Sequence, residues 1–187
     1  MKKIFFVISF LIISSTITAQ TFNKDTVHFN FGSGIGWSYH LDKKVYCDLW
    51  SLPAFVGTIE RGFFDLDSMI SFSAGVTVAY KYLENKKTNT IATWNNFLIG
   101  ATGRLYFNHF SKSKFIPYGG LFGGINAIKF RDNFYSNSNG YPTDYNGIYP
   151  IAYIFAGVKY ISKPHFGVYG EVSYGFTYFT LGLYKVL

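Results

Sequence analysis

Apolar and small polar side chains alternate at every second position in several stretches of this chain. The clearest is residues 69–82, MISFSAGVTVAYKY, in which one set of positions contains Ile70, Phe72, Ala74, Val76, Val78, Tyr80 and Tyr82. The other set contains Met69, Ser71, Ser73, Gly75, Thr77, Ala79 and Lys81. Successive side chains of a β-strand point to opposite faces, so this period predicts strands with one apolar face. No stretch after Gln20 shows the 3.6-residue period of an amphipathic helix, and the chain is predicted to be all-β.

The pattern predicts eight strands, at residues 27–38, 49–59, 69–82, 94–107, 115–129, 149–161, 166–174 and 178–186. The fifth and sixth, 115–129 and 149–161, are apolar on both faces, so the pattern leaves their orientation open. Long polar connections alternate with shorter ones: 39–48, 84–93 and 131–147 against 61–68, 108–114 and 162–165. Long loops at one end and short turns at the other are typical of an eight-stranded antiparallel up-and-down transmembrane β-barrel.

The composition of the small polar set predicts which face of each strand points into the barrel and which points outward. In the clearest strands it consists of Gly, Ser, Thr, Asn and Ala, with single charges at Lys81, Arg104 and Glu171. Eight strands leave an interior just wide enough for side chains to fill it, and this set suits such an interior. We therefore expect the apolar set to face lipid. If it faces inward instead, the chain is a soluble, lipocalin-like periplasmic carrier.

The first nineteen residues have the plan of a secretory signal peptide. Lys2 and Lys3 precede an apolar run from Ile4 to Ile13, which is followed by a polar stretch ending in Ala19. Ten apolar residues are too few for a membrane-spanning helix, which needs about 20. The sequence thus predicts a signal peptide at 1–19, a barrel domain at 20–187, and location in the cell outer membrane.

Composition strengthens the membrane interpretation. Charged residues make up 14% of the chain, against about 25% in ordinary soluble domains. Aromatic residues reach 21%, with 16 Tyr and 21 Phe, which suits girdles at a membrane interface and equally the core of a soluble sandwich. The net charge is +7 without a run of Lys or Arg, so nucleic acid is not an expected partner.

Charges inside a narrow barrel are costly unless they are paired. Arg104 and Glu171 are the expected partners, with Lys81 and Lys159 as further donors. The alternative is that each of these side chains reaches bulk water near a rim of the barrel.

Three stretches of the sequence carry a resemblance to a known family. They are the signal end at Ala19 and Gln20, FIPYGGLFGGI at 115–125, and FGVYGEVSYGFTYFTLGLYKVL at 166–187. On these, the chain from residue 20 resembles the small eight-stranded outer-membrane barrel proteins of Gram-negative bacteria, of the opacity-like or adhesin-like type. The resemblance implies outer-membrane lipid and lipopolysaccharide as surroundings, and insertion by the barrel-assembly machinery.

The sequence offers no convincing catalytic or cofactor site. His109 and Ser111 have the spacing that lipid A deacylase barrels use, but the surrounding NHFSKSK does not otherwise match, and a short periplasmic turn is the wrong end of the barrel. The remaining histidines lack ligand-like spacing, and FGSGIG at 31–36 belongs to a predicted strand rather than a phosphate loop. We expect no enzyme activity, no cofactor and no metal.

The longest predicted loop, 131–147, is rich in Tyr, Asn, Ser and Gly, the residues of adaptable recognition loops. It would contact a surface partner through Phe134, Tyr135, Tyr141 and Tyr145, or it is a hydrophilic loop without a fixed partner. The expected function is structural or surface interaction by a barrel with a filled interior. A narrow channel for small solutes is the alternative from the transport class.

Overall fold

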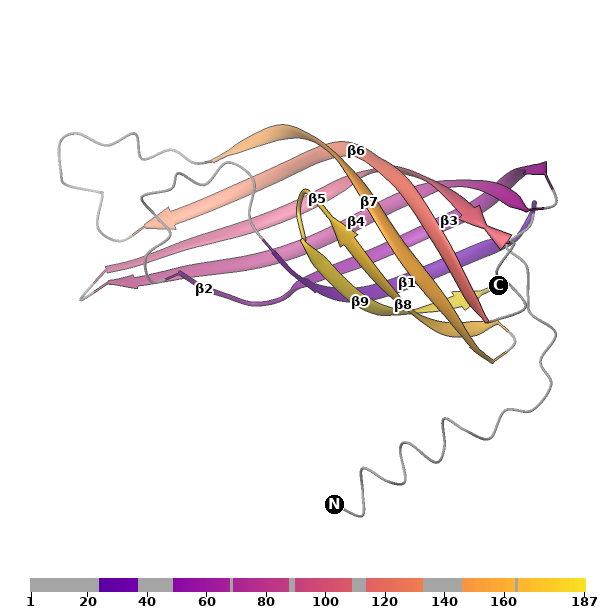
Figure 1. Cartoon of the computed structure of the whole chain (residues 1–187). Coiled ribbons are helices and arrows are strands. Elements are labelled where there is room, and N and C mark those ends of the chain that lie inside the picture. Colours follow the sequence, from indigo (N-terminus) through magenta and orange to yellow (C-terminus); the bar gives the residue numbers. More distant parts are fainter. Residues whose placement is uncertain are drawn as a thin grey trace, which may run out of the picture.

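The computed structural model describes residues 24–36, 49–67, 69–87, 90–108, 114–132, 146–163 and 165–187. Most of these residues lie in β-strands (Figure 1). The strands are β1 (Val27–Ile35), β2 (Leu49–Ser51), β3 (Ala54–Asp67), β4 (Ile70–Lys87), β5 (Thr90–Phe107), β6 (Phe115–Asp132), β7 (Gly147–Lys163), β8 (Phe166–Ser173) and β9 (Phe179–Val186). No helix in this part of the chain is long and apolar enough to cross a membrane. The predicted signal peptide, residues 1–19, lies outside the described residues and stays a prediction.

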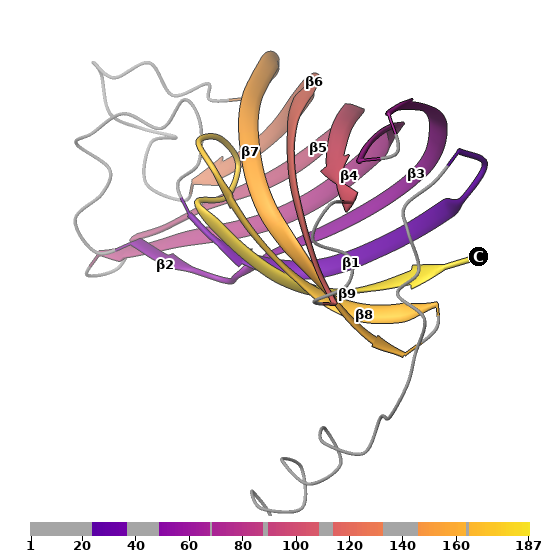
Figure 2. The ribbon, with the colours of Figure 1, turned by 45° about the vertical axis from the view of Figure 1, so that its right-hand side comes forward.

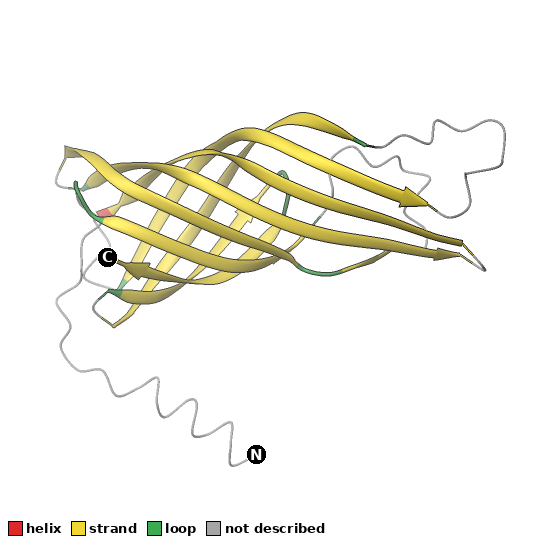
Figure 3. Ribbon diagram, turned by 180° about the vertical axis from the view of Figure 1, so that it is seen from behind, coloured by secondary structure: helices red, strands yellow, loops and turns green. Residues whose placement is uncertain are grey.

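The strands close into a barrel. From β3 to β9 each strand pairs antiparallel with the next along the chain, and β1 pairs with both β3 and β9, which completes the wall (Figures 2 and 3). β2 and β3 both pair with β4 and act as one interrupted strand, so the wall has eight strands. The prediction of an all-β, eight-stranded antiparallel up-and-down barrel is confirmed.

The interruption between β2 and β3 falls at Pro53. Leu49 pairs with Asn85 and Phe55 pairs with Tyr80, so the register slips by one residue between the two segments. The Leu52 amide still donates to the Tyr82 carbonyl, at 3.1 Å. Proline has no amide hydrogen for the ladder, and it occupies the irregular position where none is needed.

Pro150 lies in a part of β7 that pairs with a described strand on one side only. β8 ends at Ser173, opposite Phe155, so among the described strands residues 147–153 pair only with β6. The Ile154 carbonyl accepts from the Tyr174 amide at 3.3 Å, which places the even-numbered backbone groups of β7 on the β8 side. Pro150 therefore lacks its amide hydrogen on an edge without a neighbouring strand, and the β8–β9 hairpin ends well short of β4–β6 (Figure 1).

Two predicted connections are wrong because ladder pairing extends the strands through polar residues. The segment 84–93 was expected to be a loop, yet β4 and β5 continue until only residues 88 and 89 join them. Glu84 pairs with Thr93 within this extension. The expected turn at 61–68 is likewise mostly strand, since β3 runs to Asp67. The polar residues alone indicated a loop, but pairing with a long adjacent strand satisfies the backbone amide and carbonyl groups there.

Alternate residues of each strand face the interior. Ser73 and Thr77 are 2% and 3% exposed, whereas Val76 and Val78 are 54% and 41% exposed. The apolar set thus faces outward and the small polar set inward. The two strands whose orientation the sequence left open, β6 and β7, follow the same rule. Their buried residues include Tyr118, Phe122 and Asn126 of β6 and Ile151, Phe155 and Lys159 of β7, while Leu121 and Ile154 are exposed.

Glycine and aromatic residues pack against each other inside the barrel. The ring of Phe155 lies over Gly120, where an added Cβ would come within 2.4 Å of the ring and of the Gly103 carbonyl. The Tyr118 ring covers Gly157 in the same way, and the Tyr169 ring covers Gly182. Each glycine gives a large ring from a neighbouring strand the room to lie flat against the wall, which is a known device for packing glycine in sheets.

This packing predicts different effects for two glycines of β6. Gly120→Ala should lower the free energy of unfolding by about 1–3 kcal/mol, because the new methyl group overpacks the interior. Gly123→Ala, on the outer face, meets no atom within 4 Å and should be neutral or slightly stabilising. Urea unfolding of both variants in the same detergent would measure the difference, and equal effects would contradict the packing described above.

Candidate functional site in the barrel interior

Glu60 is the centre of a buried hydrogen-bond network. Its side chain is fully buried, and both carboxylate oxygens accept bonds from other strands. Oε1 accepts from Asn30 Nδ2 at 2.9 Å, Tyr106 Oη at 2.6 Å and Lys159 Nζ at 3.0 Å. Oε2 accepts from Ser73 Oγ at 2.9 Å and from an Arg104 guanidinium nitrogen at 3.0 Å. Five donors from β1, β4, β5 and β7 converge on one carboxylate, and they tie opposite walls of the barrel together.

A second carboxylate continues the network. Arg104 also donates to Glu171 at 3.4 Å, and the Tyr118 hydroxyl donates to the same oxygen at 3.1 Å. The guanidinium carbon lies 4.9 Å from the centre of the Phe155 ring. Two cations, Arg104 and Lys159, therefore meet two carboxylates, and desolvated charges are compensated both by ion pairs and by aromatic faces.

The central carboxylate is already engaged by donors of the chain itself. The carboxylate of Glu60 uses its acceptor capacity on protein donors, which leaves little for a substrate or a metal. Among the described residues, no group of three His, Cys, Asp or Glu side chains is placed to hold a metal ion. A bore of this width filled by side chains is typical of small barrels.

The residues predicted for this network divide into two groups. Arg104 and Glu171 are in contact, and Lys159 lies in the same network although its carboxylate partner is Glu60. Lys81 is apart from them: it is buried, and its ammonium group donates to the Gly36 carbonyl. The sequence suggested one group of charges, but Lys81 lies farther along β4, toward the long-loop end.

Sequence reasoning missed Glu60, the central residue. It follows the stretch 49–59 that the pattern assigned to a strand, and the neighbouring Arg61 suggested a turn. A signal was present, since Glu60 is in phase with Ala54 and Thr58, both of which face inward. Extending the alternation by one residue would have placed it on the interior face.

The other residues singled out from the sequence belong to segments outside the described residues. Phe134, Tyr135, Tyr141 and Tyr145 of the long loop lie outside the described residues, and so do His109 and Ser111. Contact of the loop with a surface partner stays a prediction.

Fold and interior together define a class: a closed eight-stranded antiparallel barrel with a filled, charged interior and an apolar outer face. No protein-family model matches the chain, and a comparison with curated proteins found no match either.

Proposed function

We propose that this chain is a small outer-membrane β-barrel with a structural or surface-interaction role, whose outer face is embedded in lipid and whose interior is closed by side chains. The observation that carries the proposal is an apolar band around the outside of the barrel. On β5 the outward residues are apolar, apart from Gly103, over the eleven residues from Phe97 to Phe107, and Asn95 and Thr93 follow beyond the band. A transmembrane strand needs about 9–11 residues, so the height of the band matches a bilayer.

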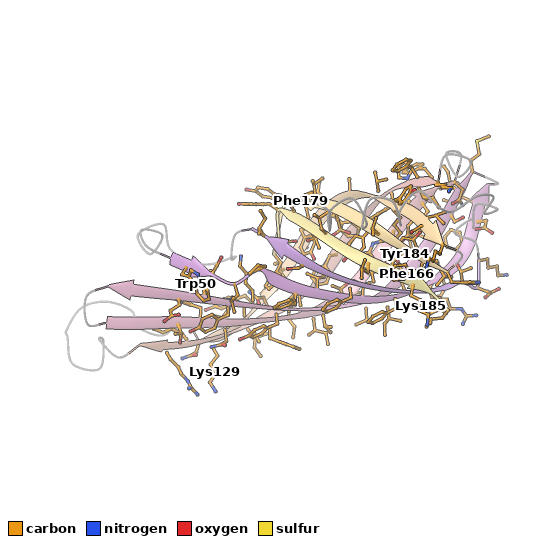
Figure 4. The ribbon with its side chains drawn as sticks, turned by 90° about the horizontal axis from the view of Figure 1, so that it is seen from below. Trp50, Lys129, Phe166, Phe179, Tyr184 and Lys185 are labelled. Atoms are coloured by element: carbon orange, nitrogen blue, oxygen red, sulfur yellow. The ribbon has the colours of Figure 1, made fainter. Side chains whose placement is uncertain are left out.

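Neighbouring strands support the same band. On β4, Val76, Val78 and Tyr80 are exposed and are followed by Glu84; on β6, Leu121 and Ile125 are exposed and are followed by Lys129. Figure 4 shows Lys129 with Trp50 toward one end of the barrel, and Lys185 with Phe166 toward the other. A water-soluble barrel would expose apolar side chains of this size on every strand, far beyond the patches found on soluble monomers.

The partners follow from this location. Lipid and lipopolysaccharide would contact the apolar band, and the barrel-assembly machinery would insert the chain. The loop 131–147 would meet any partner at the surface. The signal peptide predicted at residues 1–19 supplies the route across the inner membrane.

Cell fractionation combined with heat modification on gels tests the proposal. The full chain should be found in the outer-membrane fraction, and unboiled samples in detergent should migrate differently from boiled ones because the closed barrel resists detergent. Release of the protein into the periplasmic fraction without detergent would support the soluble carrier instead.

The same preparation separates a closed barrel from a narrow channel. In planar bilayers we expect no conductance steps above those of protein-free bilayers, because the Glu60 network fills the bore. Reproducible ohmic steps from purified protein would contradict a closed interior.

A further inference from the structure

Charge is distributed unevenly around the short-turn end of the barrel. On the β6–β9 side three lysines lie at or next to strand ends: Lys114 before β6, Lys163 at the end of β7 and Lys185 near the end of β9. The acidic residues of these four strands are Asp132, at the opposite end of β6, and Glu171, in the interior network. On the β1–β3 side, by contrast, Arg61 is joined to Asp25 at 2.8 Å. The short-turn rim of β6–β9 is therefore basic.

Strand register brings two of these lysines to either side of one aromatic ring. Phe166 pairs with Lys163 on β7 and with Lys185 on β9. Directly paired residues of an antiparallel sheet have their side chains on the same face, and all three are exposed on the outside. Figure 4 shows Phe166 and Lys185 together at this end of the barrel. Adjacent strands are about 4.8 Å apart, so the two ammonium groups can reach one ligand group beside the ring.

The ammonium groups are available to a ligand on the outer face. Lys185 forms no ion pair with a carboxylate of the described residues. Each lysine has three donors, so an ammonium that contacts another group of the protein can still bind an anion. Both lysines follow apolar outward residues of their strands, Tyr160 on β7 and Leu183 on β9, which places them where the apolar band ends.

Apolar surface continues from Phe166 toward the middle of the band. Three outward residues of β8 and β9 are 43–58% exposed: Val168, Leu181 and Leu183. Gly170 lies on the same face, between Val158 and Leu181 in the ladders. A Cβ added at Gly170 would meet only the Cδ2 atom of Leu181, at 3.5 Å. This glycine therefore leaves an open gap, one side chain deep, on the strand that begins at Phe166.

We propose that this surface binds one anionic phospholipid from the bilayer leaflet at the short-turn end. The phosphate lies between the ammonium groups of Lys163 and Lys185, which donate charge-assisted hydrogen bonds to it. An acyl chain passes from Phe166 over Val168 into the gap at Gly170. A zwitterionic phospholipid gains less from the two lysines, because it brings its own cation to the phosphate. The inference rests on the membrane location proposed above and adds a lipid preference to it.

Native mass spectrometry of the protein, purified in detergent from the outer-membrane fraction, tests the site. Titration with phosphatidylglycerol should give a saturable adduct of one lipid, and phosphatidylcholine with the same acyl chains should bind about tenfold more weakly or less well still. The double variant Lys163→Gln, Lys185→Gln should lose this preference, since each lysine near an anionic lipid surface contributes about fivefold in affinity. The double variant Lys163→Arg, Lys185→Arg keeps both charges and should keep the preference.

An equal change of charge at the other end of the barrel provides the control. Lys129 and Arg131 are exposed on the outer face of β6 at the long-loop end, and Lys129→Gln with Arg131→Gln should leave the preference within about twofold. Both glutamine variants should keep the heat-modified band, because exposed side chains are replaced. Equal binding of the two lipids by the wild-type protein, or equal losses in the two glutamine variants, would overturn the proposal.

The lipid site and the membrane location can fail separately. A heat-modifiable barrel in the outer-membrane fraction that shows no preference for phosphatidylglycerol would overturn the lipid site alone. Recovery of the chain in the periplasmic fraction without detergent would overturn the membrane location, and the lipid site with it.

Discussion

Glu60→Ala is expected to lower the free energy of unfolding by about 3–5 kcal/mol, the range measured when one partner of a buried ion pair is removed. The substitution leaves Arg104 with only Glu171, at 3.4 Å, and removes the carboxylate partner of Lys159. It also removes the acceptor for Asn30 and Ser73 on two other strands. Urea unfolding of the refolded barrel in detergent, followed by tryptophan fluorescence and by heat modification on gels, would measure the loss.

An exposed ion pair of the same chemistry provides the control. Asp25 and Arg61 are joined at 2.8 Å, closer than Arg104 and Glu60, but their side chains are 62% and 61% exposed. Arg61→Ala should therefore cost about 0–1 kcal/mol, because water replaces the lost partner. If the two substitutions had equal effects, the network around Glu60 would not be a major source of stability, and its role in holding opposite walls together would be refuted.

The fold could be predicted from sequence because one physical rule governs nearly every strand. A barrel wall separates two environments, so the two-residue period survives in strands as different as 69–82 and 94–107. The wall also fixes which set is buried: Ser73 and Thr77 face a narrow interior, and Val76 faces outward. The limits of strands were less predictable, since the period fades where both faces become polar, as between residues 84 and 93.

The interior site was only partly predictable for a different reason. Alternation assigns Arg104 and Glu171 to the inside, but it left the orientation of the strand that carries Lys159 open. It also contains no information about the position of an inward residue along the barrel axis. Register decides which inward residues meet, and register depends on pairing along the whole wall. Lys81 and Arg104 are both inward cations, yet Lys81 is opposite Asn96 and Arg104 is opposite Ser73, so only Arg104 meets Glu60.

The polar side chains around Glu60 and those around Lys81 differ in how they are bonded. In the Glu60 network charges balance and the carboxylate is bonded by five donors, which is an arrangement that stabilises the barrel. Around Lys81 the charge is unbalanced and the amides of Asn96 and Asn126 bond nothing in the chain.

Val76→Arg is expected to prevent or strongly weaken insertion of the refolding barrel into lipid vesicles. Val76 lies midway along the outer apolar stretch of β4 between Phe72 and Tyr80, and it is 54% exposed. An arginine on the lipid face at the middle of a bilayer costs about 2–4 kcal/mol. Folding into vesicles of a bilayer-forming phosphatidylcholine, followed by heat modification and by protection from protease, would measure the effect.

Thr93→Arg is the matched control, because Thr93 faces outward on β5 beyond the apolar band, beside Glu84. Charge costs fall to about 0–1 kcal/mol near the interface, so this variant should insert almost as well as the wild-type chain. If the barrel is water-soluble, Val76→Arg should instead have little effect, since a surface substitution to a charged residue usually changes stability by about 0.5 kcal/mol or less. Equal folding of both variants without any lipid would therefore argue that the apolar band does not face a membrane.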